Sequence, residues 1–169
     1  MQAIDERFFK ENRGMTKQIT RKKTSDSKYY HPDFHIALNY GIEYLHKNFG
    51  EEAVREYLMK FAKAYFAPLK KALTNKGLLA IKEHYKKIYQ IENAKFGFNI
   101  SSNELLIHLY GSPAVMYIKE EGHTVSPLFQ ETVTTVNKEI CMNTPYECEL
   151  LEYKNENGAY QLRFFNREI

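Results

Sequence analysis

The stretch "KFGFNISSNELLIHLYG", Lys95 to Gly111, decides the fold. Before it, apolar residues recur every three or four positions. Within it apolar residues recur at every second position, at 96, 98 and 100 and then at 105, 107 and 109, and of the residues between them only Leu106 is large and apolar. Strict alternation is typical of a half-buried strand, and "SSN" between the two runs is a turn. The stretch therefore predicts a β-hairpin that follows a helical region.

A second hairpin is expected near the end of the chain. The runs "YECELLEYK" and "AYQLRFF" flank "NENG", in which Asn157-Gly158 is a turn dipeptide. Two short helices are expected between the hairpins, and each is announced by a Ser-Pro pair, at Ser112-Pro113 and Ser126-Pro127. Serine is favoured as an N-cap and proline at the first helical position.

Residues 29–94 carry helical periodicity. We predict helices from three sets of apolar residues at helical spacing, with Pro68 kinking or splitting the second. The sets are Phe34, Leu38, Ile42 and Leu45; Val54, Leu58, Phe61, Tyr65 and Leu69; and Leu78, Ile81, Tyr85 and Ile88. The expected fold class is α+β, in one domain over 29–169: helices over 29–94, then hairpin-helix-helix-hairpin over 95–169. The two hairpins would form one four-stranded antiparallel sheet covered by helices.

Residues 1–28 are expected to be an N-terminal helix and a basic linker. Ile4, Phe8 and Phe9 would share one side of a helix over 3–12, which would pack on the domain or on a second subunit of a homodimer. Residues 13–28 hold six basic residues against one acid, within a chain whose net charge is +3. No aromatic residues are interleaved and no nucleic-acid motif surrounds them, so we expect a solvated linker rather than a nucleic-acid partner. The alternative is that this basic segment contacts nucleic acid or an acidic protein.

Composition excludes several classes of protein. The chain has 169 residues, with 43% hydrophobic and 27% charged side chains, and no run reaches the roughly 20 apolar residues that span a bilayer. We therefore expect no contact with a membrane. Two cysteines are too few for a disulfide framework, so we expect a cytoplasmic protein. His31 and His35 have helical spacing without a supporting Glu-x-x-His motif, and no P-loop or dinucleotide fingerprint occurs. We therefore expect neither a metal nor a cofactor.

The predicted helix from Ser126 carries an unusual number of uncharged polar residues. Phe129, Val133, Val136 and Ile140 have core spacing. Gln130, Thr134 and Asn137 form a neutral stripe beside them, and Glu131, Thr135 and Lys138 form the next. Buried polar groups must be paired. The stripe therefore either lines a ligand pocket or forms a structural seam, and the sequence leaves both interpretations open.

If the stripe lines a pocket, its chemistry can be assigned residue by residue. Glu131 or His123 would activate water as a general base. The amides at helix starts Ser112 and Ser126 would bind a carboxylate. Gln130, Thr134, Thr135 and Asn137 would orient the ligand.

The segment from Gly111 to Phe165 resembles the L-2-amino-thiazoline-4-carboxylic acid hydrolase-like family. The resemblance is carried by "SPAV" at 112–115 followed by "PLFQE" at 127–131, with strands after it, and the helical "GEEAVREYL" upstream also fits. Ser112 and Gln130 stand where many members would carry Cys. The resemblance implies a hydrolase of a carbon-nitrogen bond, other than a peptide bond, in a small cyclic compound. The alternative is a non-catalytic domain that binds a small molecule on the same fold.

Overall fold

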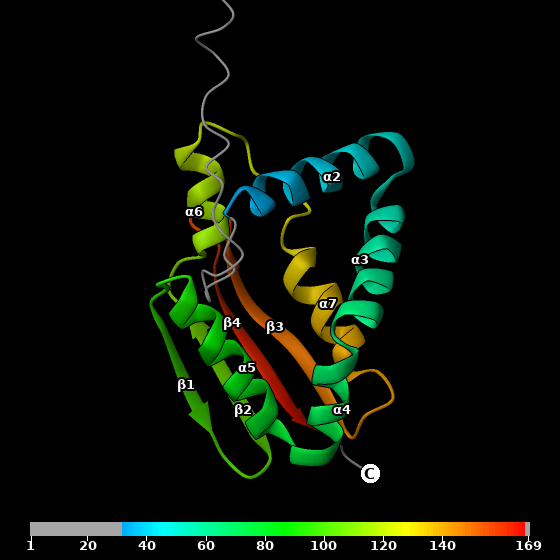
Figure 1. The fold of residues 1–169 in the computed structure, drawn as a ribbon, viewed down its shortest axis with the longest axis vertical. Coiled ribbons are helices and arrows are strands. Elements are labelled where there is room, and N and C mark those ends of the chain that lie inside the picture. The colour runs from blue at the N-terminus through cyan, green and yellow to red at the C-terminus, as the bar shows by residue number, and fades with distance from the viewer. Residues whose placement is uncertain (1–31, 168–169) are drawn as a thin grey trace, which may run out of the picture.

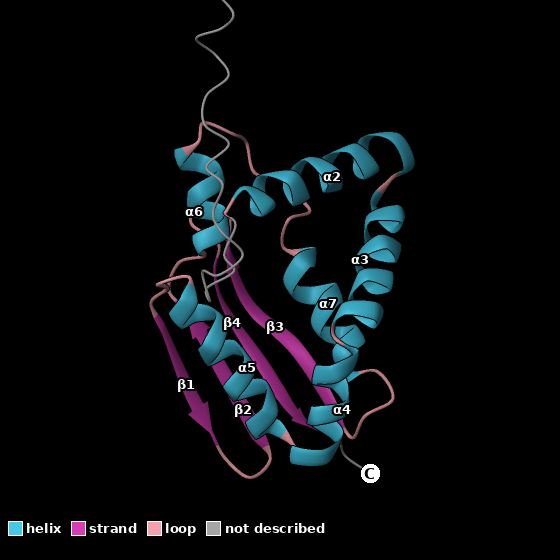
Figure 2. Cartoon of the chain, viewed as in Figure 1, coloured by secondary structure: helices cyan, strands magenta, loops and turns pink. Residues whose placement is uncertain are grey.

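The structure, a computed structural model, describes residues 32–167. The expected N-terminal helix, the basic linker and His31 lie outside these residues. Six helices and four strands are described (Figures 1 and 2). The helices are α2 (Asp33–Phe49), α3 (Glu51–Tyr65), α4 (Ala67–Lys76), α5 (Leu78–Ile91), α6 (Pro113–Glu120) and α7 (Glu131–Cys141). The strands are β1 (Phe96–Ile100), β2 (Glu104–Leu109), β3 (Tyr146–Lys154) and β4 (Ala159–Asn166).

The four strands form one antiparallel sheet in the order β1-β2-β4-β3. This confirms the predicted α+β fold and the pairing of two hairpins. One core-facing row crosses all four strands: Phe98 pairs with Ile107, Ile107 with Leu162, and Leu162 with Leu150. A register shift follows Leu150. Because side chains alternate between the two faces of a sheet, this shift changes the face toward which the side chains after Leu150 point.

Helices gather on one face of the sheet (Figure 1). α5 and α7 lie over the strands, and α3 packs on the outer side of α7. α2 crosses one end of α3 and α7, where it contacts α3 and α6. The interior is filled by aliphatic and aromatic residues of both layers. They include Ile42, Val54, Leu58, Leu73, Ile81, Leu105, Ile107, Leu162 and Phe164.

Two residues of the apolar sets that predicted the helices lie at the surface. Phe34 is 53% exposed and Tyr65 is 67% exposed, although both helices form as expected. α2 buries Asn39 and Ile42, and α3 buries Val54, Leu58 and Ala62. Spacing alone could not reveal the side on which each helix meets its neighbours. The break at Pro68 is confirmed, because α3 ends at Tyr65 and α4 begins at Ala67.

The expected start of the second Ser-Pro helix is wrong. α7 begins at Glu131, and residues 127–130 form tight turns instead. The Phe129 N–H donates to the Ser126 carbonyl at 2.9 Å and the Glu131 N–H to the Leu128 carbonyl at 3.0 Å, both bonds three residues back. Leu128 and Phe129, which lie within these turns, are both buried in the core. At the first Ser-Pro pair the prediction is confirmed: Ser112 Oγ accepts from the Val115 N–H and α6 starts at Pro113.

Candidate functional site

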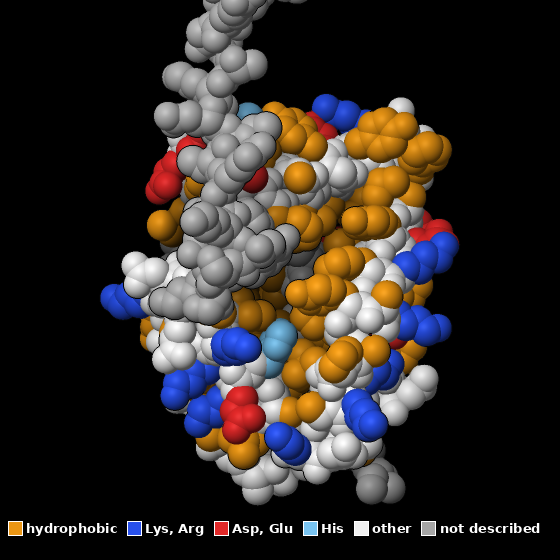
Figure 3. Space-filling view, viewed as in Figure 1, with side chains coloured by type: hydrophobic (Ala, Val, Ile, Leu, Met, Phe, Trp, Pro, Cys, Tyr) orange, Lys and Arg blue, Asp and Glu red, His pale blue; other side chains and the backbone are white. Residues whose placement is uncertain are grey.

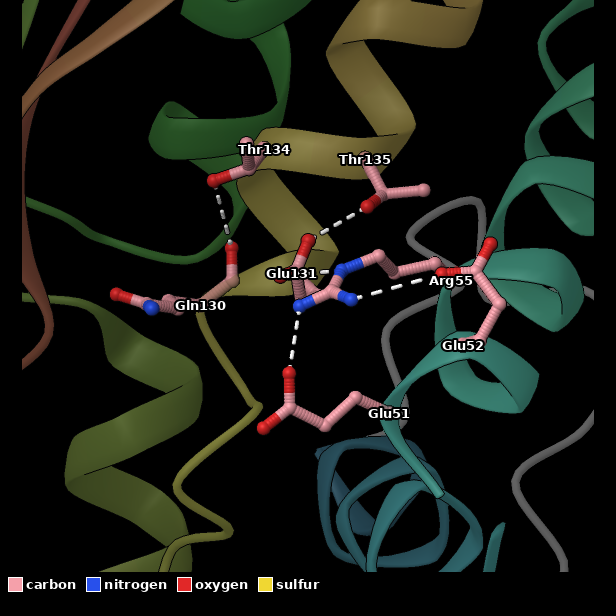
Figure 4. Close-up of polar contacts among 7 residues, drawn as sticks. All are labelled: Glu51, Glu52, Arg55, Gln130, Glu131, Thr134 and Thr135. Atoms are coloured by element: carbon pink, nitrogen blue, oxygen red, sulfur yellow. Dashed lines mark hydrogen bonds and ion pairs between the residues drawn. The ribbon is translucent and has the colours of Figure 1, made fainter. Parts of the chain in front are cut away.

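Glu131, the expected general base, is a buried carboxylate between α7 and α3. Arg55 Nε lies 3.2 Å from its Oε1, and the Thr135 hydroxyl donates to its Oε2 at 2.6 Å (Figure 4). Arg55 also contacts Glu51 at 2.8 Å and Glu52 at 3.6 Å. Hydrogen bonds to Glu51 and Glu131 raise the pKa of Arg55, so the guanidinium stays charged. Both Glu131 oxygens are therefore engaged within the protein.

Asn137 is likewise held by the fold. It is 1% exposed, and its Oδ1 accepts from the Tyr85 hydroxyl at 2.7 Å. Its Nδ2 donates to the Val133 carbonyl at 2.8 Å. Burial raises the pKa of Tyr85 well above its usual value, so this hydroxyl remains a donor. Asn137 joins α7 to α5.

Thr134 and His123 also have partners within the protein. Thr134 Oγ1 donates to the Gln130 carbonyl at 3.4 Å (Figure 4). His123 Nδ1 lies 2.9 Å from the Tyr40 hydroxyl, and the two rings meet edge to face. His123 thus contacts α2, whereas Glu131 contacts α3. The two candidate bases engage different helices.

A small pocket collects two of the expected ligand-binding residues. It has a volume of about 250 Å³ and lies between the segment before α7 and the end of β3. Its lining consists of Val125, Ser126, Pro127, Gln130, Tyr153 and Asn155. None of these described lining residues is charged. Burial raises the pKa of Tyr153 to about 12, so its phenol is neutral at physiological pH.

The loop that forms this pocket is fixed by Asn39 of α2. Asn39 is fully buried; its Nδ2 donates to the Thr124 carbonyl at 2.9 Å, and its Oδ1 accepts from the Ser126 N–H at 2.8 Å. Ser126 Oγ accepts from the Leu128 N–H at 3.3 Å. Ser126 therefore stabilises a turn, and its backbone amide is already bonded. The expected carboxylate site at a helix start does not form there.

Ser112 lies against the turn between β3 and β4 rather than in the pocket lining. Its N–H donates to the Asn157 carbonyl at 2.9 Å. Of the eight predicted residues, the structure thus brings Ser126 and Gln130 to one pocket. It places Glu131 and Thr135 in the contact with α3.

A second pocket, of about 190 Å³, contains none of the predicted residues. It is lined by His108, Leu109, Tyr110, Glu152, Lys154, Asn157, Ala159, Tyr160 and Gln161. Glu152 is paired there with Lys154 at 3.3 Å and accepts from Gln161 at 3.0 Å. These polar groups satisfy one another.

Sequence reasoning missed the most perturbed carboxyl of the chain's described part. Burial raises the pKa of Glu92, just after α5, to about 7. Its Oε1 lies 3.7 Å from His35 Nε2, and burial lowers the pKa of His35. Burial thus disfavours the charged forms of both groups. Glu92 follows the helix end in "QIENAK", where nothing in the sequence separates it from a surface acid.

The two thiols are also close to each other. Cys141 ends α7 and is buried, and Cys148 lies half-buried on β3. The hydrogen bond that the Cys141 thiol donates to Cys148 raises the pKa of Cys141, and burial raises it further. Both effects keep the thiol protonated, as expected for packing residues rather than nucleophiles.

The described residues contain neither a metal-binding cluster nor a membrane-spanning helix. Between positions 32 and 167, no three His, Cys, Asp or Glu side chains are grouped so that they could hold a metal ion. None of the described helices has the length and apolar character needed to cross a bilayer.

Comparison with family models of known proteins gives no match for this chain, and comparison with curated proteins gives none either.

Proposed function

We propose that the protein is a small-molecule-binding domain whose ligand occupies the pocket lined by Val125, Ser126, Pro127, Gln130, Tyr153 and Asn155. The supporting observation is the pocket's uncharged lining next to a loop that Asn39 fixes from α2. Small-molecule sites combine apolar walls with a few polar groups that orient the ligand. Here the Tyr153 ring and Val125 supply the walls. Gln130 and Asn155 supply amide groups.

The lining favours a neutral ligand. An unpaired charge is costly to desolvate, and none of the described lining residues offers a counter-charge. The ligand class that fits is a neutral cyclic amide, urea or related heterocycle of about ten non-hydrogen atoms, given a volume of about 250 Å³.

A fragment screen by thermal shift tests this proposal. The screen compares neutral lactams and heteroaromatic amides with carboxylates built on the same rings. Neutral members should raise Tm, and the shift should be lost in Gln130→Ala but kept in Gln90→Ala, an exposed position on α5. Preferential binding of the carboxylates, or equal shifts in both variants, would contradict it.

Hydrolysis of a small cyclic compound, implied by the family resemblance, remains a second proposal. Glu131 directly follows the pocket residue Gln130, which favours it, but its carboxylate would have to leave Arg55 to reach a substrate. Turnover of 2-amino-thiazoline-4-carboxylate can be followed by the thiol that ring opening releases, after subtraction of a blank for Cys141 and Cys148. Turnover that Glu131→Gln removes, with the fold intact, would make the protein an enzyme.

A further inference from the structure

The solvent side of α2 differs from that of the other long helices. Its exposed residues between positions 34 and 46 are all uncharged: Phe34, Ala37, Tyr40, Gly41 and Tyr44. In contrast, α3 exposes Glu52, Glu56, Lys60 and Lys63, and α5 exposes Glu83, Lys86 and Lys87. Hydrophobic side chains gather over α2 and the adjoining end of α3 (Figure 3). Exposed aromatic residues without charges are typical of an interface centre.

We propose that this face of α2 binds α2 of a second copy of the chain, in an antiparallel arrangement. The two-fold axis would pass between Tyr40 and Gly41. Tyr44 and Ala37 lie equally far from that point, about 5 Å along the helix at 1.5 Å per residue. Each Tyr44 ring would therefore lie opposite Ala37 of the second copy.

Space and charge on α2 both favour this partner. A side chain added at Gly41 would meet nothing within 4 Å, so a second helix can approach closely there. The exposed charges of α2 lie near its two ends, with Asp33 at the start and Lys47 in the last turn. Within one copy Lys47 pairs with Glu43 at 2.6 Å, and Asp33 accepts from the Tyr117 hydroxyl at 2.7 Å. Antiparallel pairing brings Asp33 of each copy near Lys47 of the other, which adds a second partner to each charge, and it aligns the helix dipoles favourably. The same surface is thus complementary to itself.

The size of the surface sets the expected strength. A helix of 17 residues is about 25 Å long. Stable dimers bury about 800 Å² per partner, which one helix face and neighbouring Phe49 only partly supply. We therefore expect a reversible dimer that dissociates on dilution.

Sedimentation velocity of the full chain over a concentration series tests the proposal. The wild-type protein should shift from monomer to dimer as concentration rises. Gly41→Glu should stay monomeric, because it brings two like charges together at the axis, and its fold should hold because glutamate favours a helix more than glycine does. Met59→Glu adds the same charge to exposed α3 and should dimerise like the wild type.

A cysteine variant tests whether Gly41 of one copy lies close to Gly41 of the other. Gly41→Cys lies beside the axis and should form a disulfide-linked dimer on oxidation with diamide, whereas Met59→Cys should not exceed the wild-type background from Cys141 and Cys148. A chain that is monomeric at every concentration would overturn the proposal and assign the face to residues 1–31 or to a different protein. Dimerisation that Gly41→Glu leaves unchanged would also overturn it, by placing the interface elsewhere.

Discussion

At the scale of single residues, the partners of Glu131 explain the polar stripe on α7. Thr135 lies four residues after it on α7, as the sequence indicates, and does donate to its carboxylate. Arg55, the other partner, is 76 residues away and belongs to a helix whose charged residues look like a solvated face. The polar stripe could be recognised from the sequence, but its partners could not. Much of it is a structural seam between α7 and the helices beside it.

Gly158 gives the sharpest prediction for one residue. Its φ is +66°, and an added Cβ would lie 2.5 Å from Val115 Cγ2 and 2.7 Å from Ser112 Cβ. Gly158→Ala should lower the free energy of unfolding by about 2 to 4 kcal/mol, from backbone strain and overpacking together. Urea denaturation measures the loss. The control is Gly122→Ala, where φ is +80° and nothing lies within 4 Å; it should cost only about 1 kcal/mol from strain. Equal losses would refute the packing argument.

At the scale of elements, the sequence predicted the helices and strands whose positions depend on neighbouring residues alone. The hairpins follow from alternation over a few residues, and the α3–α4 break follows from Pro68. The start of α7 could not be found this way. Asn39, 87 residues before Ser126, bonds the loop in which a helix was expected and holds it as a turn. A Ser-Pro pair gives the position of a chain reversal, but a distant partner decides whether a helix begins there.

Asn39 therefore links the fold to the proposed pocket. Asn39→Ala would leave the Thr124 carbonyl and the Ser126 N–H without their partner. The free energy of unfolding should fall by about 2 to 3 kcal/mol, since both groups are buried or partly buried. Asn48→Ala, on the exposed side of the same helix, should change it by less than about 0.5 kcal/mol. Any fragment bound by the wild type should bind more weakly to Asn39→Ala. Unchanged affinity would mean that fragment binding does not depend on the loop that Asn39 holds.

For the whole molecule, Glu92 predicts how stability depends on pH. It sits where α5 leaves the helical layer, and the Tyr89 and Tyr160 hydroxyls, which contact each other, lie near it. Burial raises its pKa from 4.5 to about 7, so between these values the folded state binds a proton that the unfolded state has lost. The stability that Glu92 contributes is present below about pH 4.5 and is lost as pH rises through 7. His35 acts in the opposite sense, because its lowered pKa costs stability as pH falls.

Replacing the carboxyl separates these two effects. Glu92→Gln keeps the size of the side chain and removes its titration, while His35 still titrates in both proteins. The variant should match the wild type below pH 4.5 and exceed it above pH 7, by up to about 3 kcal/mol from the shift of the pKa. Urea denaturation at several pH values measures the difference, and Glu83→Gln on the exposed side of α5 should show no such trend. A constant difference across the pH range would mean that Glu92 is solvated in the folded protein. The helical layer would then be open at the end of α5, between His35 and the Tyr89–Tyr160 contact.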